Sequence, residues 1–255
     1  MKDEFFKGVK QWEFNLRGMQ GMLPTFYYDT TSLTAVYTAS TRQVKQRLPL
    51  ALMNPIELLP GRCLVAFTAF EYRRTDIDPY NEFSIAFLTT FRRRQIPLVT
   101  AAVQLLARKL SAFVWKLPVT TEIARTGGVE MFGYPKFIAD IDFHREEDQI
   151  ICRLAEKQQA ILTLKGKILP TKRRKISRVQ TYSVIGDIPL VANVVFNPLE
   201  MAVSSSRRAA TLEIGSVHPI ASELRALGLS KSPFQYLYSP VSQAILFAGR
   251  NLMDN

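Results

Sequence analysis

Alternating apolar and polar positions dominate the chain and predict a fold built mainly from β-strands. In the clearest stretch, 64–72, the even-numbered residues up to Phe70 are apolar except for the hydroxyl of Thr68, and residues 65, 67 and 69 are wholly apolar. Side chains of a strand point alternately to its two faces, so this pattern predicts a strand that is covered on both sides. A turn-rich loop is expected at 75–82, after which 83–90 continues as a strand.

The rest of the chain alternates short strand patterns with a few helical ones. Helical spacing predicts a helix from about 41 to 48, capped by Ser40 or Thr41, and helices at 97–110 and 220–227. A short helix at 120–125 is expected to end at Gly127-Gly128. Further strands are expected at 33–38, 113–117, 137–141, 150–155, 160–164, 179–184, 190–196, 211–214 and 234–247, the last interrupted at Pro240.

This order of elements favours the α+β class: a large, mostly antiparallel, curved sheet or β-barrel with a few flanking helices. No internal repeat or composition break marks a linker. We therefore expect an N-terminal arm at 1–21, which is a candidate contact with a partner subunit, and a single domain at 22–255.

Composition narrows the functional classes. The chain has 255 residues, of which 47% are hydrophobic and 22% are charged, as expected for a globular protein with a substantial core. The sequence contains no apolar run of about 18 residues and no apolar signal segment after Met1, so we expect a cytoplasmic protein without a membrane span. Cys63 and Cys152 are expected in the core, and with only His144 and His218 beside them they do not predict a metal site.

The net charge of +11 raises the question of a nucleic-acid partner. The basic runs 92–94 and 172–175 lie in expected loops and lack any zinc-finger or RNA-recognition spacing. Solvated loops are therefore the favoured interpretation, and nucleic-acid binding stays a third hypothesis that steep salt dependence would support.

One lysine has an unusual sequence environment. Gly133 and Pro135 predict a tight bend, and Lys136 follows it directly, before the expected strand at 137–141. Most lysines are exposed, which is the alternative for this one. A lysine buried among apolar groups, however, loses hydration of its ammonium form, and the neutral amine can attack a ketone or aldehyde to form a Schiff base.

The segment 130–136, with Glu130 and Gly-Tyr-Pro-Lys, resembles the active-site segment of the acetoacetate decarboxylase family. The resemblance extends over about 33–246 and implies that Lys136 is the Schiff-base lysine. The family usually has a second lysine next, where this chain has Phe137, so burial alone would have to activate the amine. Pro79-Tyr80-Asn81-Glu82 is similar to the family's Tyr-x-Glu loop, which implies proton transfer by Glu82, although an acid in such a turn is ordinarily solvated.

Two polar positions depart from the family pattern. The family arginine that assists with the substrate carboxylate would fall near Thr30, but the sequence there is Asp29-Thr30-Thr31-Ser32. A second active-site glutamate falls at or near Thr68. Loss of a bidentate carboxylate anchor makes Schiff-base chemistry on a carbonyl compound a safer expectation than decarboxylation of acetoacetate itself.

The resemblance thus implies a Schiff-base lyase that acts on a small β-keto acid, another oxo acid or a ketone, without a metal or organic cofactor. Its partners would be this small molecule and further copies of the chain in a homo-oligomer. The sequence predicts no membrane partner and disfavours a nucleic-acid partner, which stays the third hypothesis. The alternatives are an aldolase or dehydratase that uses the same lysine, and a small-molecule-binding protein that has lost turnover. Besides Lys136 and Glu82, the substrate-binding or supporting candidates are Tyr80, Thr68, Glu122, Glu130, Phe132, Tyr134 and Phe137.

Overall fold

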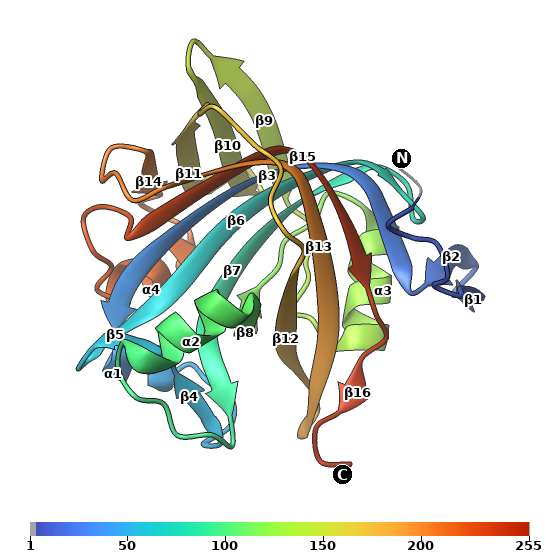
Figure 1. Ribbon diagram of the computed structural model, residues 1–255, viewed down its shortest axis with the longest axis horizontal. Coiled ribbons are helices and arrows are strands. Elements are labelled where there is room, and N and C mark those ends of the chain that lie inside the picture. The colour runs from blue at the N-terminus through green and yellow to red at the C-terminus, as the bar shows by residue number, and fades with distance from the viewer. Residues whose placement is uncertain (1–3, 255) are drawn as a thin grey trace.

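A closed barrel of seven strands forms the centre of the computed structural model, which describes residues 4–254 (Figure 1). The strands follow one another around the barrel in the order β7, β8, β12, β13, β15, β3 and β6, and pairing of β6 with β7 closes the ring. Neighbours are antiparallel except for β8 and β12, which run parallel. The bounds are β3 (Thr25–Ser40), β6 (Arg62–Thr75), β7 (Tyr80–Phe91), β8 (Lys109–Lys116), β12 (Ser177–Ile185), β13 (Ile188–Ser204) and β15 (Gln235–Leu246).

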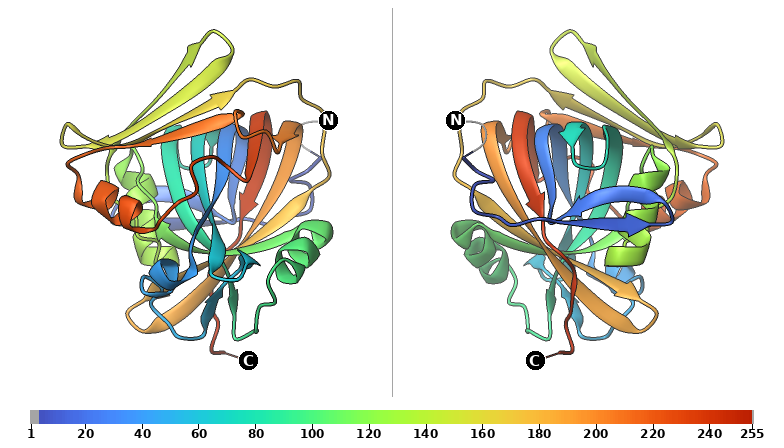
Figure 2. Two further views of the ribbon diagram at one scale, coloured as in Figure 1. Left: turned by 90° about the vertical axis from the view of Figure 1, so that its left-hand side faces the viewer. Right: turned by 90° about the vertical axis from the view of Figure 1, so that its right-hand side faces the viewer.

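Short strands extend the barrel and a second sheet covers one side of it (Figure 2). The second sheet has the order β14, β11, β10, β9, all antiparallel. Its strands are β9 (Asp140–Glu146), β10 (Gln149–Glu156), β11 (Gln159–Lys167) and β14 (Ala210–Ile214), and the short strands are β4 (Met53–Pro55), β5 (Glu57–Leu59) and β16 (Arg250–Asn251).

The main hydrophobic core lies between this second sheet and the outer face of β3, β6 and β7. Phe67 and Phe87 of the barrel are fully buried there with Leu154 and Leu162 of the second sheet. The other face of β6 points into the barrel, where Thr68 lines a cavity. The prediction of a strand covered on both faces is therefore confirmed, and the α+β barrel class with it.

Four helices flank the barrel within the described residues: α1 (Thr41–Lys45), α2 (Val99–Ala107), α3 (Glu122–Phe132) and α4 (Pro219–Ala226). Helix α2 lies at one end of the barrel, where Ala101 packs with Val36 and Ile56 (Figure 1). It ends earlier than expected because Arg108 is left-handed and Lys109 already begins β8. In the described part of the chain, no helix combines the length and the apolar character needed to cross a bilayer.

The expected N-terminal arm folds onto the barrel of its own chain. After a turn at 4–8, strands β1 (Trp12–Leu16) and β2 (Met19–Leu23) form a hairpin. The ring of Phe6 lies 4.7 Å from that of Phe26 on β3 and packs with Ile245 on β15. Residues 1–3 of the arm lie outside the described residues.

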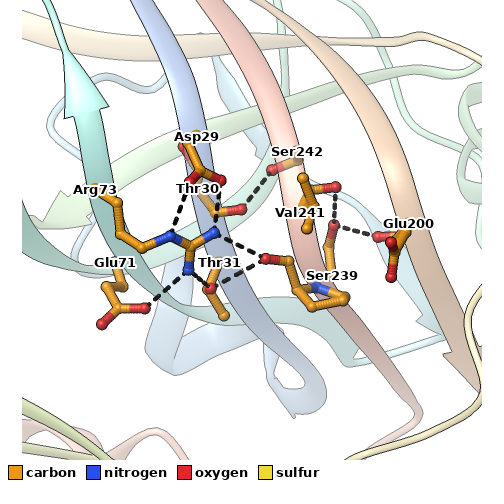
Figure 3. Close-up of polar contacts among 10 residues, drawn as sticks. Asp29, Thr30, Thr31, Glu71, Arg73, Glu200, Ser239, Val241 and Ser242 are labelled. Atoms are coloured by element: carbon orange, nitrogen blue, oxygen red, sulfur yellow. Dashed lines mark hydrogen bonds and ion pairs between the residues drawn. The ribbon is translucent and has the colours of Figure 1, made fainter. Parts of the chain in front are cut away.

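An arginine on the outer face of β6 joins two irregular strands, as Figure 3 shows. The register shifts after Tyr27 and Asp29 in β3 and around Ser242 in β15 bend the barrel wall. The Arg73 guanidinium donates to Asp29 over 2.6 Å and to the Pro240 carbonyl over 3.1 Å. Arg73 thus ties both bulged strands to β6 on the side away from the barrel interior.

Both cysteines are buried in the core, as expected. Burial raises the pKa of the Cys63 thiol to about 11, and it also raises the pKa of Cys152. At pH 8 the thiolate fraction of Cys63 is then about one in a thousand, and only the thiolate is nucleophilic. We expect iodoacetamide at pH 8 to leave the native protein essentially unlabelled and to label two thiols in 6 M guanidinium. Rapid labelling of native protein would contradict this placement.

Candidate active site: a buried lysine and glutamate in the barrel

Helix α3 does not end at the double glycine as expected but continues to Phe132. Gly133, with φ of 63°, ends it instead, and the amide of Tyr134 bonds the carbonyl of Gly128 over 3.0 Å. The prediction was wrong because glycine also occurs inside a helix where a Cβ would collide with a neighbouring side chain. A Cβ on Gly128 would collide with the aliphatic carbons of Lys136. The lack of a side chain at Gly128 therefore leaves room for the lysine to cross the helix.

The lysine segment turns at Pro135, where the Lys136 amide donates to the Tyr134 carbonyl over 2.7 Å, and it is hydrogen-bonded to the chain that follows β8. The amide of Leu117 donates to the Pro135 carbonyl over 3.2 Å, and that of Val119 donates to the Phe137 carbonyl over 2.9 Å. The strand expected at 137–141 begins only at Asp140. In this segment Lys136 points to the barrel cavity and Phe137 packs against the main core on the other side.

Glu82 meets Lys136 inside the barrel. The Lys136 Nζ lies 2.7 Å from Glu82 Oε2, and only 6% of the lysine side chain and 9% of the glutamate side chain are exposed. Glu82 was expected in a loop but lies on β7, because the β6–β7 hairpin continues as far as the pair Tyr72 and Tyr80. A rigid strand therefore holds the carboxylate against the amine.

Three tyrosines surround the pair. The Tyr72 hydroxyl donates to Glu82 Oε1 over 3.2 Å, and Lys136 Nζ lies 5.5 Å from the centre of the Tyr80 ring. The hydroxyls of Tyr80 and Tyr27 are 3.2 Å apart. Burial, followed by the negative charge of Glu82, raises the pKa of all three phenols above the ordinary 10.0, so they remain neutral and can donate hydrogen bonds.

The pair lies at a cavity of about 320 Å³ in the barrel. Among its lining residues in the described chain, Lys136 and Glu82 are the charged ones. The lining is otherwise mostly apolar, with hydroxyls that include those of Thr34 and Thr68, which bond each other over 3.1 Å. Within residues 4–254 no cluster of three or more His, Cys, Asp or Glu side chains could hold a metal ion.

The structure brings together some of the residues expected at the site. Lys136, Glu82, Thr68 and Tyr134 line the cavity, and Tyr80 contacts the amine from behind it. Four other candidates lie elsewhere: Phe137 in the core, Phe132 stacked on the outer side of the Tyr134 ring, Glu122 paired with Arg125 at 2.7 Å, and Glu130 paired with Arg17 at 2.7 Å.

Sequence reasoning missed Tyr27, Tyr72, Thr181 and Gly128. Tyr72 could have been found, since it continues the even-numbered cavity face of β6. Tyr27 could not, because the register shifts in β3 break the alternation that would place it. Thr181, whose hydroxyl lies 2.6 Å from that of Tyr134, comes from a distant strand.

The arginine that the sequence lacks near Thr30 has no replacement among the described residues that line the barrel cavity. Arg73 reaches Asp29 and Thr31, but from the outer face, and is absent from the residues that line the cavity (Figure 3). A ligand in the described cavity therefore meets a single cationic group, the amine of Lys136.

Placing a methyl group on Gly128 is expected to displace Lys136. Gly128→Ala should slow capture of a carbonyl compound by Lys136 about 10- to 100-fold, because a shift of about 1 Å in a reacting group can cost that much. The measurement is the rate of reductive trapping by borohydride, followed by intact mass.

Gly127→Ala provides the matched control, since a Cβ there would meet no side chain or distant backbone atom of the described residues within 4 Å. This neighbouring change should leave trapping unaltered and raise helix stability by up to about 1 kcal/mol. Equal trapping rates for the two variants would contradict a positioning role of Gly128.

Comparisons with known proteins identify the family of the chain and support its fold. The family model described as "Acetoacetate decarboxylase (ADC)" matches residues 14–238. Two acetoacetate decarboxylase structures are similar to this one. The first has a TM-score of 0.61 and a sequence identity of 14%, and the match covers 90% of this chain and 89% of that chain. The second, from Legionella pneumophila, has a TM-score of 0.64 and a sequence identity of 15%, and the match covers 98% of this chain and 94% of that chain. A third similar structure is that of the enduracididine biosynthesis enzyme MppR, complexed with the condensation product of pyruvate and imidazole 4-carboxaldehyde. It has a TM-score of 0.62 and a sequence identity of 13%, and the match covers 89% of this chain and 88% of that chain.

No curated protein sequence matches the chain. At 13–15% identity the similar structures establish the fold, and the family model covers most of the sequence. With this match over residues 14–238, the chain belongs to the acetoacetate decarboxylase family.

Proposed function

We propose that the protein is an enzyme that forms a Schiff base between Lys136 and a carbonyl compound, most simply a β-keto acid that it decarboxylates. The observation that carries the proposal is the buried contact of 2.7 Å between Lys136 Nζ and Glu82 Oε2 at an apolar cavity. An amine held there can lose a proton to the carboxylate and attack a carbonyl carbon away from bulk water.

Each residue of the pair has a distinct role. The Lys136 nitrogen adds to the carbonyl carbon, and the oxygen leaves as water after Glu82 returns a proton to it. In a β-keto acid the carbon–carboxylate bond then breaks, its electron pair moves to the iminium, and carbon dioxide leaves an enamine. Glu82 regains a proton from solvent and gives it to the enamine carbon, which restores the iminium. Addition of water then releases the ketone and returns the lysine as its ammonium form beside the Glu82 carboxylate.

The neutral tyrosines support the polar steps. Tyr72 donates to Glu82 and so fixes the carboxylate that moves the proton. The Tyr80 ring presents its electron-rich face to the Lys136 nitrogen, which stabilises the cationic iminium as well as the ammonium. In this proposal the developing positive charge lies between a carboxylate and an aromatic ring.

A second candidate reaction follows from the lack of another cation in the described cavity lining. An aldol-type addition or dehydration passes through the same enamine and needs no carboxylate anchor. The MppR complexes with pyruvate and with a condensation product are consistent with such chemistry in this fold. A protein that binds a carbonyl ligand without turnover is the remaining alternative.

The test is reductive trapping. The protein is incubated with acetoacetate, pyruvate and a panel of aldehydes and ketones, each with borohydride, and peptides are mapped by mass spectrometry. The proposal expects an adduct on Lys136, with carbon dioxide release from acetoacetate separating decarboxylation from addition chemistry. A panel that leaves Lys136 unmodified would overturn imine formation and favour the binding protein.

A further inference from the structure

The cavity continues well beyond the reactive pair, along the inside of the barrel. On β7 its lining runs from Glu82 to Leu88, seven residues whose six steps cover about 20 Å of strand. Beside it on β6, Ala66 pairs with Ala86 in the middle of this span, and Leu64 lies at the far end. The charged groups thus lie at one end, and the wall towards helix α2 is mostly apolar, with the polar side chains of Gln104, Ser177 and Gln235 among it.

The volume exceeds what a small oxo acid needs. A four-carbon oxo acid occupies on the order of 100 Å³, roughly the share of three or four water molecules, whereas the cavity holds about 320 Å³. The remaining space is lined mainly by apolar side chains, which gain contacts only from an apolar group. A small substrate would leave most of this wall without a partner.

Some of the polar side chains along the span have partners within the protein, while Ser84, Ser177 and Gln235 also line the cavity. Thr34 and Thr68 bond each other over 3.1 Å, and Gln104 of α2 bonds Ser111 over 2.8 Å. They therefore make little demand for a polar ligand group in this region.

The cavity also reaches the surface at apolar side chains. Leu105 of α2 and Phe234 before β15 both line it, and they are 47% and 41% exposed. An apolar chain can enter past such residues without losing hydrogen bonds at the entrance.

We infer that the substrate carries a long unbranched apolar tail, with its carbonyl at Lys136 and the tail directed along the barrel towards α2. The chemical class is a medium-chain 3-oxo acid or the corresponding methyl ketone, rather than a four-carbon oxo acid. This inference rests on the proposed function, because it takes Lys136 as the group that meets the carbonyl.

The experiment is a chain-length series. Methyl ketones from acetone to 2-undecanone, with the matching 3-oxo acids, are trapped with borohydride, and the concentration for half-maximal labelling of Lys136 is measured. Each added methylene should lower that concentration about threefold to fourfold until the cavity is filled. A series that is flat with chain length while Lys136 is still labelled would overturn the tail and leave the imine proposal standing.

Variants separate the tail site from general hydrophobicity. Ala86→Leu fills the middle of the span and should collapse the long-to-short labelling ratio by at least about 30-fold, with Ala86→Val intermediate if the larger change impairs folding. Ala102→Leu adds the same apolar volume on the exposed side of α2 and should preserve the ratio. An unchanged ratio in both Ala86 variants would also overturn the inference.

A last readout distinguishes the two proposals if no ketone labels Lys136. The rise in melting temperature with 2-undecanone, compared with 2-butanone, reports tail binding without covalent chemistry. If the longer ketone gives the larger rise in melting temperature, and this difference is lost in Ala86→Leu, the tail-binding site is supported and only imine formation is overturned. Equal rises would remove both.

Discussion

Replacing Lys136 by arginine should abolish borohydride-dependent labelling at residue 136 and lower turnover of a carbonyl substrate by on the order of 10³-fold or more. Arginine keeps a positive charge beside Glu82, so the buried carboxylate retains a partner. Its guanidinium, however, stays protonated and cannot add to a carbonyl. The measurements are intact mass after reductive trapping and steady-state turnover of the best substrate in the panel.

The same substitution at another lysine gives the control. Lys116 pairs with Glu223 at 3.1 Å outside the cavity lining, so Lys116→Arg should keep both labelling and turnover. Labelling and turnover that survive in Lys136→Arg would place the chemistry on a different amine and end the proposal.

Removing one member of the buried pair should produce the largest loss of stability. Lys136→Met leaves the Glu82 carboxylate without its cationic partner in a site that is 9% exposed. Breaking a buried ion pair from one side costs about 3–5 kcal/mol, because the remaining charge stays desolvated. The free energy of unfolding from urea titrations should fall by this amount, and the melting temperature by about 10 °C.

A double-mutant cycle and an exposed pair test the cause. The double variant Lys136→Met with Glu82→Gln removes both charges and should recover most of the loss, because no buried charge is left unpaired. Lys165→Met breaks an exposed pair with Glu213, whose atoms are 2.6 Å apart, and should cost less than about 1 kcal/mol. Additive effects of the two cavity mutations would show that the pair is not coupled.

The barrel could be predicted from the sequence where alternation is regular and not where it is broken. The hairpin of β10 and β11 and the two-sided strand β6 follow directly from period-two patterns. The strand expected at 33–38 proved to be Thr25–Ser40, because bulges after Tyr27 and Asp29 disturb the alternation of its first half. Local pattern cannot show that β8 pairs with a strand more than 60 residues later.

The site was predictable in its two reactive residues but not in what holds them. Lys136 and Glu82 were found through the family resemblance. They are 54 residues apart in the sequence, and only the fold brings them into contact. Glu82 was placed in a loop because Asp-Pro favours turns, although the hairpin pairing extends past it. Gly128 was interpreted as a helix stop because local sequence does not show its contact with the side chain of Lys136, eight residues later.

The parallel pairing of β8 with β12 has a consequence for how the protein is assembled. Parallel neighbours cannot be joined by a tight turn, so the chain makes a long excursion at 117–176 before it rejoins the barrel. That excursion contains α3, Lys136 and three strands of the second sheet. The β8–β12 seam of the barrel therefore closes around the segment that carries the reactive amine, and we expect the site to form only once this non-local pairing is made.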